Sequence, residues 1–426
     1  MPRSSHIRTI VWTAIVTVIL ALVVTNLTTA DPRLRTQVEH RYGVAEPQFL
    51  RTMGVLLGPP VAEGNSVQHL ENGVRIFPAM LEAIASAERT ITFEMYIYWS
   101  GEIADRFAAA LIERARSGVK VHVLLDWVGS AKMDLTLIDR MRDGGIEVER
   151  FHKPTIRNLP RMNNRTHRRI LVIDGKVGFT GGVGIGDEWT GDAHGPDHWR
   201  ESHFRVEGPV VAQMQAVFVD NWTRATGRVL YTEDYFPSLT ARGQAPAQMF
   251  SSSPAGGSES MHLMYLLAIS AAQESILLSG SYFVPDALAV EALVKARERG
   301  VRVSIIVPGP HMDVEVVRRA SRARWGELLA AGVEIAEYQP TMYHVKVLVI
   351  DGFMVSVGST NFDNRSFRIN DEASLNVYDR QLAAQMQQVF EADLAKSKRV
   401  TLEMWENRPF REKVVEQVAS QLGRQL

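Results

Sequence analysis

Cysteine is absent from the 426-residue chain. Its absence excludes disulfide bonds, thiol nucleophiles and thiolate metal sites. A surplus of charge is missing too, because 47 Lys and Arg residues stand against 48 Asp and Glu residues. This balance does not point to a nucleic-acid-binding protein. With 46% hydrophobic and 22% charged residues, the chain is globular and long enough for one large core or two of ordinary size.

The first thirty residues contain a long run without charge. It extends from Thr9 to Ala30 and follows Arg3, His6 and Arg8. At about 1.5 Å per residue, such a helix crosses the roughly 30 Å hydrocarbon core of a bilayer. We therefore expect an N-terminal transmembrane helix in residues 1–30. The alternative is a cleaved signal peptide, since "TTA" before Asp31 resembles a cleavage site.

The rest of the chain repeats itself. The repeats predict a helix end with a strand, a glycine-closed helix with a strand, a buried strand and a late helix, always in the same order. The matching segments are 83–98 with 268–283, 114–126 with 295–309, 166–175 with 343–352, and 211–218 with 382–390. This pattern predicts an α/β fold of two homologous halves, each a mixed β-sheet flanked by helices.

These repeats also divide the chain into domains. The Pro-, Ser- and Gly-rich stretch between the repeats favours a linker there. The predicted segments are an anchor at 1–30, a linker at 31–69, a first half at 70–235, a linker at 236–260, a second half at 261–400 and a helical tail at 401–426. Within the tail, residues 410–426 are typical of an amphipathic helix that lies on a membrane or caps the second half.

Polar residues recur at the start of one repeated strand. "THRRILVIDG" contains His167 and Arg169, and "YHVKVLVIDG" contains His344 and Lys346. Side chains two residues apart lie on one face of a strand. Each histidine should therefore project together with its cation. Two such pairs on duplicated halves suggest one shared cleft between the halves, where cations hold a phosphoryl group, one histidine attacks and the other protonates the leaving oxygen.

Carboxylates recur at matching positions as well. Glu201 and Glu372 each precede a later strand, and a carboxylate that accepts from one ring N–H would orient each imidazole. Asp174 and Asp351 each follow the repeated strand and precede glycine. Asp-Gly is a hairpin-turn dipeptide. The two aspartates are therefore either turn residues or buried partners of the site.

The second motif carries a resemblance to a known family. "HVKVLVIDGFMVSVGSTNFD" fits the H-x-K-x4-D-x6-G-S-x-N signature of the phospholipase D superfamily, and its branch of bacterial cardiolipin synthases is the most similar in appearance. The matching residues are His344, Lys346, Asp351, Gly358, Ser359 and Asn361. The first copy departs from the signature at Arg169, which replaces lysine, and at Gly184, which replaces asparagine. Arginine retains the charge but differs in shape.

This resemblance implies a membrane-anchored phosphatidyltransferase in the bacterial inner membrane. It would act through a phosphohistidine on phosphatidylglycerol, giving cardiolipin and glycerol, with no metal or other cofactor. It also implies a catalytic set of His167, Arg169, Asp174, His344, Lys346 and Asp351, supported by Glu201, Glu372, Ser359 and Asn361. By similarity to relatives with two motifs, His167 is expected to be the nucleophile.

Three alternatives remain open from the sequence. A hydrolase would use water in place of the lipid acceptor, and acceptor choice depends on how well the cleft excludes water. A nuclease is a further possibility, because arginines are concentrated in "TIRNLPRMNNRTHRR". The balanced charge and the apolar N-terminus argue against it. A non-catalytic lipid-binding protein would explain the departures at Arg169 and Gly184. The sequence indicates no oligomeric state.

Overall fold

A single mixed β-sheet organises the computed structural model, which describes residues 3–28, 38–153, 163–254 and 260–421. Among these residues the strand order is β17-β12-β11-β9-β13-β14-β16-β8-β1-β7-β6-β5-β2-β3-β4. The strands before residue 210 are β1 (Ala62–Glu71), β2 (Thr90–Met95), β3 (Lys120–Asp126), β4 (Glu147–Phe151), β5 (Arg169–Ile173), β6 (Val177–Gly181) and β7 (Ser202–Glu207). Those after it are β8 (Ala245–Ser252), β9 (Ser275–Gly280), β11 (Arg302–Pro308), β12 (Glu334–Tyr338), β13 (Lys346–Ile350), β14 (Met354–Gly358), β16 (Glu372–Tyr378) and β17 (Ser397–Val400). β10 (Phe283–Val284) and β15 (Phe362–Asp363) form a separate parallel pair.

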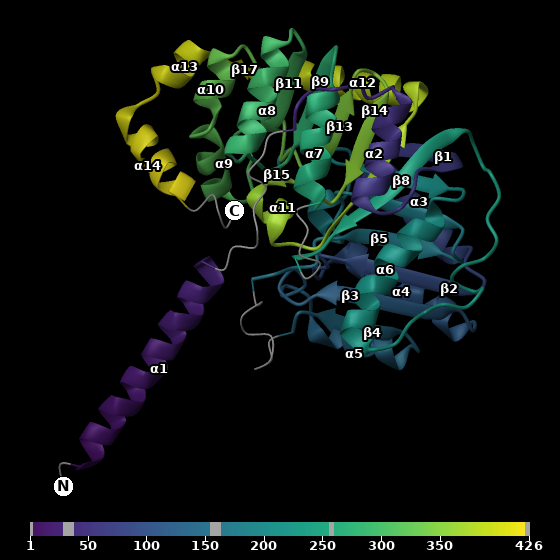
Figure 1. Ribbon diagram of the computed structural model, residues 1–426. Helices are drawn as coiled ribbons and strands as arrows, with labels where there is room; N and C mark the ends of the chain where they lie inside the picture. Colours follow the sequence, from purple (N-terminus) through teal and green to yellow (C-terminus); the bar gives the residue numbers. More distant parts are fainter. Residues whose placement is uncertain (1–2, 29–37, 154–162, 255–259, 422–426) are drawn as a thin grey trace.

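The sheet is internally symmetric about its middle. Reading outward, the order β1-β7-β6-β5-β2-β3-β4 on one side matches β8-β16-β14-β13-β9-β11-β12 on the other. β1 and β8 join the halves by an antiparallel pairing whose register shifts between Ala62 and Asn65. The predicted duplication of a mixed α/β unit is therefore confirmed, and Figure 1 shows the two halves as the upper and lower parts of the molecule.

Helices cover both faces of this sheet. Side chains of α3, α4 and α5 pack with β2, β3 and β5, and those of α7, α8 and α10 pack with β9, β11 and β12. On the other face, α6 and α12 share one core with strands of both halves. The bounds are α1 (Arg3–Thr28), α2 (Pro47–Leu57), α3 (Asn72–Ala85), α4 (Glu102–Arg116), α5 (Leu135–Asp143), η2 (Asp187–Trp189), α6 (Val211–Thr226), α7 (Ser260–Ala271), α8 (Ala287–Glu298), α9 (Glu315–Arg322), α10 (Trp325–Ala330), α11 (Asn364–Arg368), α12 (Arg380–Ala395), α13 (Leu402–Glu406) and α14 (Phe410–Gln421).

Both segments that were predicted as linkers contribute to the fold. The segment 31–69 contains α2 and most of β1, and the segment 236–260 contains β8. Phe49 and Met53 of α2 are fully buried in the core of the second half, beside Met264 of α7. Short amphipathic elements surrounded by turn residues resemble connectors in composition, which is why the sequence did not distinguish them. The domain boundaries themselves stay a prediction.

The two ends of the chain differ from each other. The apolar N-terminal run forms α1, which Figure 1 shows apart from the sheet. In the part of the chain that the structure describes, no helix combines the length and the apolarity needed to cross a bilayer. The predicted transmembrane helix is thus not confirmed. At the other end, α14 packs on α9 of the second half, as the capping alternative predicted.

Candidate active site

The two halves exchange backbone hydrogen bonds where the motif strands begin. The amide of His167 donates to the carbonyl of Asp371 at 2.9 Å, and the amide of Asp371 donates to Arg165 at 2.8 Å. The same crossing recurs on the other side, where His344 donates to Arg200 and Arg200 donates to Met342, both at 2.9 Å. Each motif histidine is therefore fixed against the segment that leads into the glutamate strand of the opposite half.

This crossing pairs each histidine with a glutamate from the other half. His167 Nδ1 lies 2.9 and 3.1 Å from the carboxylate oxygens of Glu372. His344 Nδ1 lies 2.5 Å from Glu201 Oε2. All four side chains are buried. In the tautomer whose Nδ1–H donates to the carboxylate, Nε2 is unprotonated and can accept a hydrogen bond. The expected carboxylate partners are present, and their exchange between halves was not foreseen.

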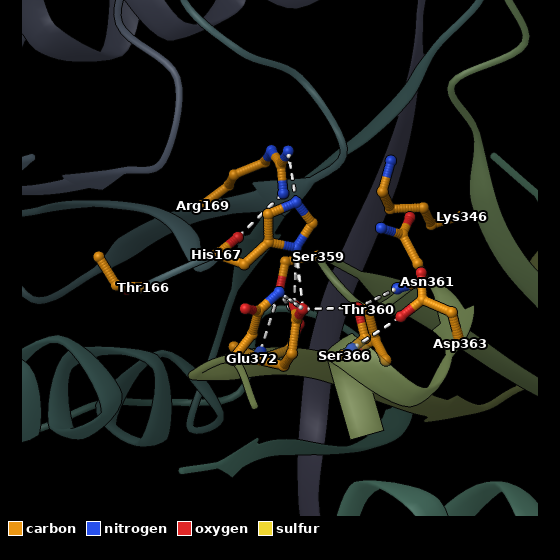
Figure 2. A network of polar contacts seen from close by, with 12 residues as sticks. Thr166, His167, Arg169, Lys346, Ser359, Thr360, Asn361, Asp363, Ser366 and Glu372 are labelled. Carbon is orange, nitrogen blue, oxygen red and sulfur yellow. Dashed lines mark hydrogen bonds and ion pairs between the residues drawn. The ribbon is translucent and has the colours of Figure 1, made fainter. Parts of the chain in front are cut away.

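The surroundings of the two glutamates are unequal. Glu372 accepts hydrogen bonds from Ser359 Oγ at 2.5 Å, Ser366 Oγ at 2.7 Å and Asn370 Nδ2 at 3.3 Å. Figure 2 shows Glu372 below His167, with dashed lines to the side chains around it. Glu201 accepts from the backbone amide of Ser202 at 2.9 Å.

The first half has no room for a counterpart of Ser359. A Cβ at Gly182, the matching position, would lie 2.5 Å from both oxygens of Glu201. Glu372 is thus the carboxylate that more donors stabilise as an anion.

One cation accompanies each histidine, as the spacing of two residues predicted. Arg169 donates to the carbonyl of His167 at 2.9 Å and lies 3.2 Å from its Nε2. Lys346 donates to the carbonyl of His344 at 2.9 Å and lies within 3.3 Å of both ring nitrogens. Each of the two positive charges acts on both histidines, so the four side chains form one site.

Burial dominates the ionisation of this site. Desolvation, followed by the neighbouring cations, holds the pKa of both His167 and His344 well below the usual value, which favours neutral imidazoles. Burial raises the pKa of Glu201 and of Glu372 to about 7. It also lowers the pKa of Lys346 to about 7. Glu201, Glu372 and Lys346 can therefore each gain or lose a proton near neutral pH.

Aromatic rings that the sequence analysis missed surround the histidines. The ring centroid of Tyr96 lies 4.7 Å from that of His167, and those of Trp189 and Trp199 each lie 5.3 Å from His344. The tryptophans precede Glu201 in "GDEWTGDAHGPDHWR", and that position was the only signal available. These rings pack against the histidines, which are 6% and 4% exposed.

The departure at Gly184 has a structural cause. A Cβ there would lie 3.0 Å from the ring of Trp189 and 3.1 Å from Ile97. Trp189 is fully buried. In the second half, Asn361 at the matching position accepts a hydrogen bond from Ser281 at 2.7 Å. The first motif has therefore replaced an amide by an aromatic ring that packs against the opposite histidine.

Asp174 and Asp351 lie outside the site. Each follows the far end of its strand, roughly 20 Å from the histidine at about 3.3 Å per residue. Asp174 accepts from the backbone amides of Glu88, Arg89 and Thr90 at 2.7–3.0 Å, and Asp351 accepts from three consecutive amides (Gln273, Glu274 and Ser275) at 2.8 Å each. Both have a φ of +51°. The structure thus gives them a turn role and does not bring them to the histidines.

The arginine-rich stretch before the first motif has mixed roles. Arg168 is buried and donates to the carbonyls of Val217 and Ser252, away from Arg169. The charge of Arg165 acts on Tyr96, next to His167. Arg157 and Arg161 lie outside the described residues. Within the described ranges, no group of three or more His, Asp or Glu side chains is arranged to hold a metal ion.

Two imidazoles oriented by carboxylates around two cations define an enzyme that transfers phosphodiester groups. The family model "Cardiolipin synthase, PLD-like domain" matches residues 80–222 and 265–394, one match in each half. The cardiolipin synthase of Geobacillus kaustophilus is 35% identical over 369 residues, which cover 85% of this chain and 73% of the relative. Cardiolipin synthase 1 of Staphylococcus aureus is 35% identical over 84% of this chain and 73% of its own length.

Comparison with solved structures agrees on the fold. The crystal structure of phosphatidylserine synthase from Haemophilus influenzae aligns with a TM-score of 0.64 at 14% identity, over 84% of this chain and 93% of that one. The chain therefore belongs to the cardiolipin synthase family with phospholipase D-like domains, as the second motif predicted.

Proposed function

We propose that this enzyme transfers a phosphatidyl group from one phosphatidylglycerol molecule to another, forming cardiolipin and glycerol. The observation that carries the proposal is the crossed arrangement, in which each histidine is oriented by a glutamate of the opposite half beside a buried cation. Such a site supplies a nucleophile, a proton carrier and charge for the phosphate oxygens. Family membership supports the same chemistry.

In the first step His167 Nε2 attacks phosphorus. Burial raises the pKa of Glu201 to about 7, so the His344–Glu201 pair can start with the proton on Glu201, which donates to His344 Nδ1, while the neutral ring carries its own proton at Nε2. The P–N bond forms as the bond from phosphorus to the glycerol oxygen breaks, and His344 gives its Nε2 proton to that oxygen. Arg169 and Lys346 hold the non-bridging phosphate oxygens, whose charge must be stabilised in the transition state. Glycerol leaves, and the phosphatidyl group remains on His167.

In the second step a hydroxyl of another phosphatidylglycerol attacks the same phosphorus. His344 takes the hydroxyl proton, a new P–O bond forms and the P–N bond breaks. His167 then returns to its neutral form, and His344 carries the proton for the next cycle. The aromatic side chains Tyr96, Trp189 and Trp199 favour a lipid hydroxyl over water, because they enclose the histidines.

The unequal glutamates support His167 as the nucleophile. An imidazole bonded to phosphorus at Nε2 and to hydrogen at Nδ1 is positively charged, so it needs an anionic partner. Glu372 accepts from Ser359, Ser366 and Asn370 in addition to His167, and these donors favour its anion. Glu201 accepts from fewer donors. This suits the His344–Glu201 pair, which gives up a proton in the first step and takes one back in the second.

A phosphodiester hydrolase is the second candidate, since the same phosphohistidine can be attacked by water. Purified protein incubated with phosphatidylglycerol distinguishes the candidates. Cardiolipin and glycerol in equal amounts would support transfer. Phosphatidic acid as the main product would show that the enzyme is a hydrolase. The absence of any product would indicate a non-catalytic relative.

The proposed substrates place the protein at a bacterial membrane. α1 supports this location, because Ile10, Trp12 and Val18 are 67%, 66% and 58% exposed. Apolar side chains in water favour transfer to lipid. Fractionation of cells that express the full chain or a chain lacking residues 1–30 tests the proposal. We expect the full chain in the membrane fraction and a larger soluble share of the shortened one. Equal distribution would contradict a role for α1.

A further inference from the structure

The C-terminal helix α14 exposes four large apolar side chains and buries a charged one. Its side toward α9 carries Glu416, which forms ion pairs with Arg322 Nε at 2.9 Å and with Arg408 Nε at 2.6 Å. Its outer side carries Phe410, Val414, Val415 and Val418, which are 79%, 45%, 40% and 65% exposed. Surface helices of soluble domains normally turn the apolar side inward.

The outer residues form one continuous stripe. Phe410, Val414 and Val418 follow each other at intervals of four, which places them on one face of the helix. Arg411 and Lys413 are also exposed on this helix and add two positive charges, whereas the charge of Glu412 between them is paired with Arg322 at 3.6 Å. An apolar stripe with basic residues matches the surface of a bilayer that contains anionic lipids.

This helix is also close to the catalytic site. Ala419 of α14 packs in one small core with Val317 and Ala320 of α9, and Tyr282 and Met312 pack against that core. Tyr282 donates a hydrogen bond of 2.6 Å to Asp313, whose carboxylate is influenced by the charge of Lys346. α14 is thus linked to the surroundings of Lys346 through α9, Tyr282 and Asp313. Figure 1 shows α13 and α14 at the outer edge of the second half.

We infer that the outer face of α14, formed by Phe410, Val414, Val415 and Val418, docks on an anionic phospholipid bilayer and holds the site at the lipid surface. The inference rests on the proposed function for its choice of a lipid surface as partner. The buried ion pairs fix α14 to the enzyme, so binding of the stripe sets the distance and orientation of the cleft relative to the headgroups. This attachment is additional to any contribution of α1.

The lack of cysteine makes the inference directly testable. The full chain with Val418→Cys is labelled with an environment-sensitive fluorophore and mixed with phosphatidylglycerol vesicles. We expect a blue shift and quenching by lipids that carry a quencher on the acyl chain. Gln388→Cys on the exposed surface of α12 is the matched control and should keep the emission of water. A shift that needs no vesicles and grows with protein concentration would show a second copy on this face and overturn the inference.

A second variant connects the face to turnover. Val414→Asp with Val418→Asp should reduce transfer on vesicles by about tenfold or more, because burial of two apolar side chains is lost. Activity on short-chain lipid in detergent should stay unchanged, which also shows that the variant folds. Gln385→Asp with Gln388→Asp adds the same charge to α12 and should have no effect. Equal activity of both variants on vesicles would contradict the inference. Because the labelled probe needs no turnover, its result is independent of whether cardiolipin is formed.

Discussion

The two halves of the enzyme share one backbone plan but differ in the chemistry around the histidines. In the second half, Ser359 and Ser366 secure Glu372, and Asn361 completes the motif. In the first half, glycine stands at positions 182 and 184, and Trp189 fills the space. Because the glutamates are exchanged, the larger hydrogen-bond network of the second half orients the histidine of the first half. Two halves with the same fold thus support different roles, one as nucleophile and one as proton carrier.

Removal of each histidine should have the largest effect and should separate the roles of the two halves. His167→Ala and His344→Ala should both reduce transfer from phosphatidylglycerol by at least about a thousandfold. A donor with p-nitrophenol as the leaving group needs no protonation. His344→Ala should therefore still release one equivalent of nitrophenol from this donor in a burst, and His167→Ala should release none. A burst in the His167 variant alone would reverse the two roles.

Loss of each glutamate should have the same kind of effect as loss of the histidine that it contacts. Glu372→Gln and Glu201→Gln keep the size of the side chain but lose the charge, and each should lower kcat by about 10²–10⁴-fold. The p-nitrophenol donor should rescue the first step in Glu201→Gln, which acts through His344, but not in Glu372→Gln. Rates of nitrophenol release in the two variants measure this difference. Equal rates of nitrophenol release in the two variants would mean that the two glutamates do not act on different steps of the reaction.

The two cations should differ in their dependence on pH. Burial lowers the pKa of Lys346 to about 7. Lys346 is therefore charged below that pH and loses its charge as the pH rises through it. We expect kcat/KM to fall on the alkaline side, and Lys346→Arg to retain activity to higher pH, because arginine remains protonated. An unchanged alkaline fall of kcat/KM in Lys346→Arg would show that Lys346 is not the titrating group.

The transfer activity of Arg169→Lys should equal or exceed that of the parent near pH 6.5. The activity of Arg169→Ala should fall by orders of magnitude, because the charge that stabilises the phosphate is lost.

The smallest effect on chemistry is expected at the two aspartates. Asp174→Ala and Asp351→Ala each leave three backbone amides without their acceptor, and alanine disfavours the positive φ. We expect each variant to lose about 2–4 kcal/mol of stability. The kcat of the folded enzyme should stay within about twofold, because both positions are remote from the histidines. Thermal unfolding and kcat, measured on the same samples, test this separation. A large loss of kcat without a loss of stability would return the aspartates to the site.

The sequence predicted those features that depend on local pattern. The repeated strands, the projection of His167 with Arg169 and the matched positions of Glu201 and Glu372 all follow from periodicity and alignment of the two repeats. The exchange of glutamates could not be predicted, because it depends on how the two halves dock. The sequence around Glu201 and Glu372 is the same whether each glutamate contacts the histidine of its own half or that of the other half. For Asp174 and Asp351 the sequence left a turn role and a site role open, and the structure gives the turn contacts because seven residues along a strand lead away from the histidine. Trp189 was missed because its contact with His344 also crosses between the halves.

His167, oriented by a glutamate of the other half, is the residue that we expect to carry the phosphatidyl group. Rapid denaturation of the enzyme during turnover, followed by proteolysis and mass spectrometry at neutral to alkaline pH, locates the modified residue. We expect a phosphatidyl group on the peptide that contains His167. Its amount should be larger in Glu201→Gln when the p-nitrophenol donor is used, because the second step then lacks its base. A phosphatidyl group on His344 with none on His167 would show that His344 is the nucleophile.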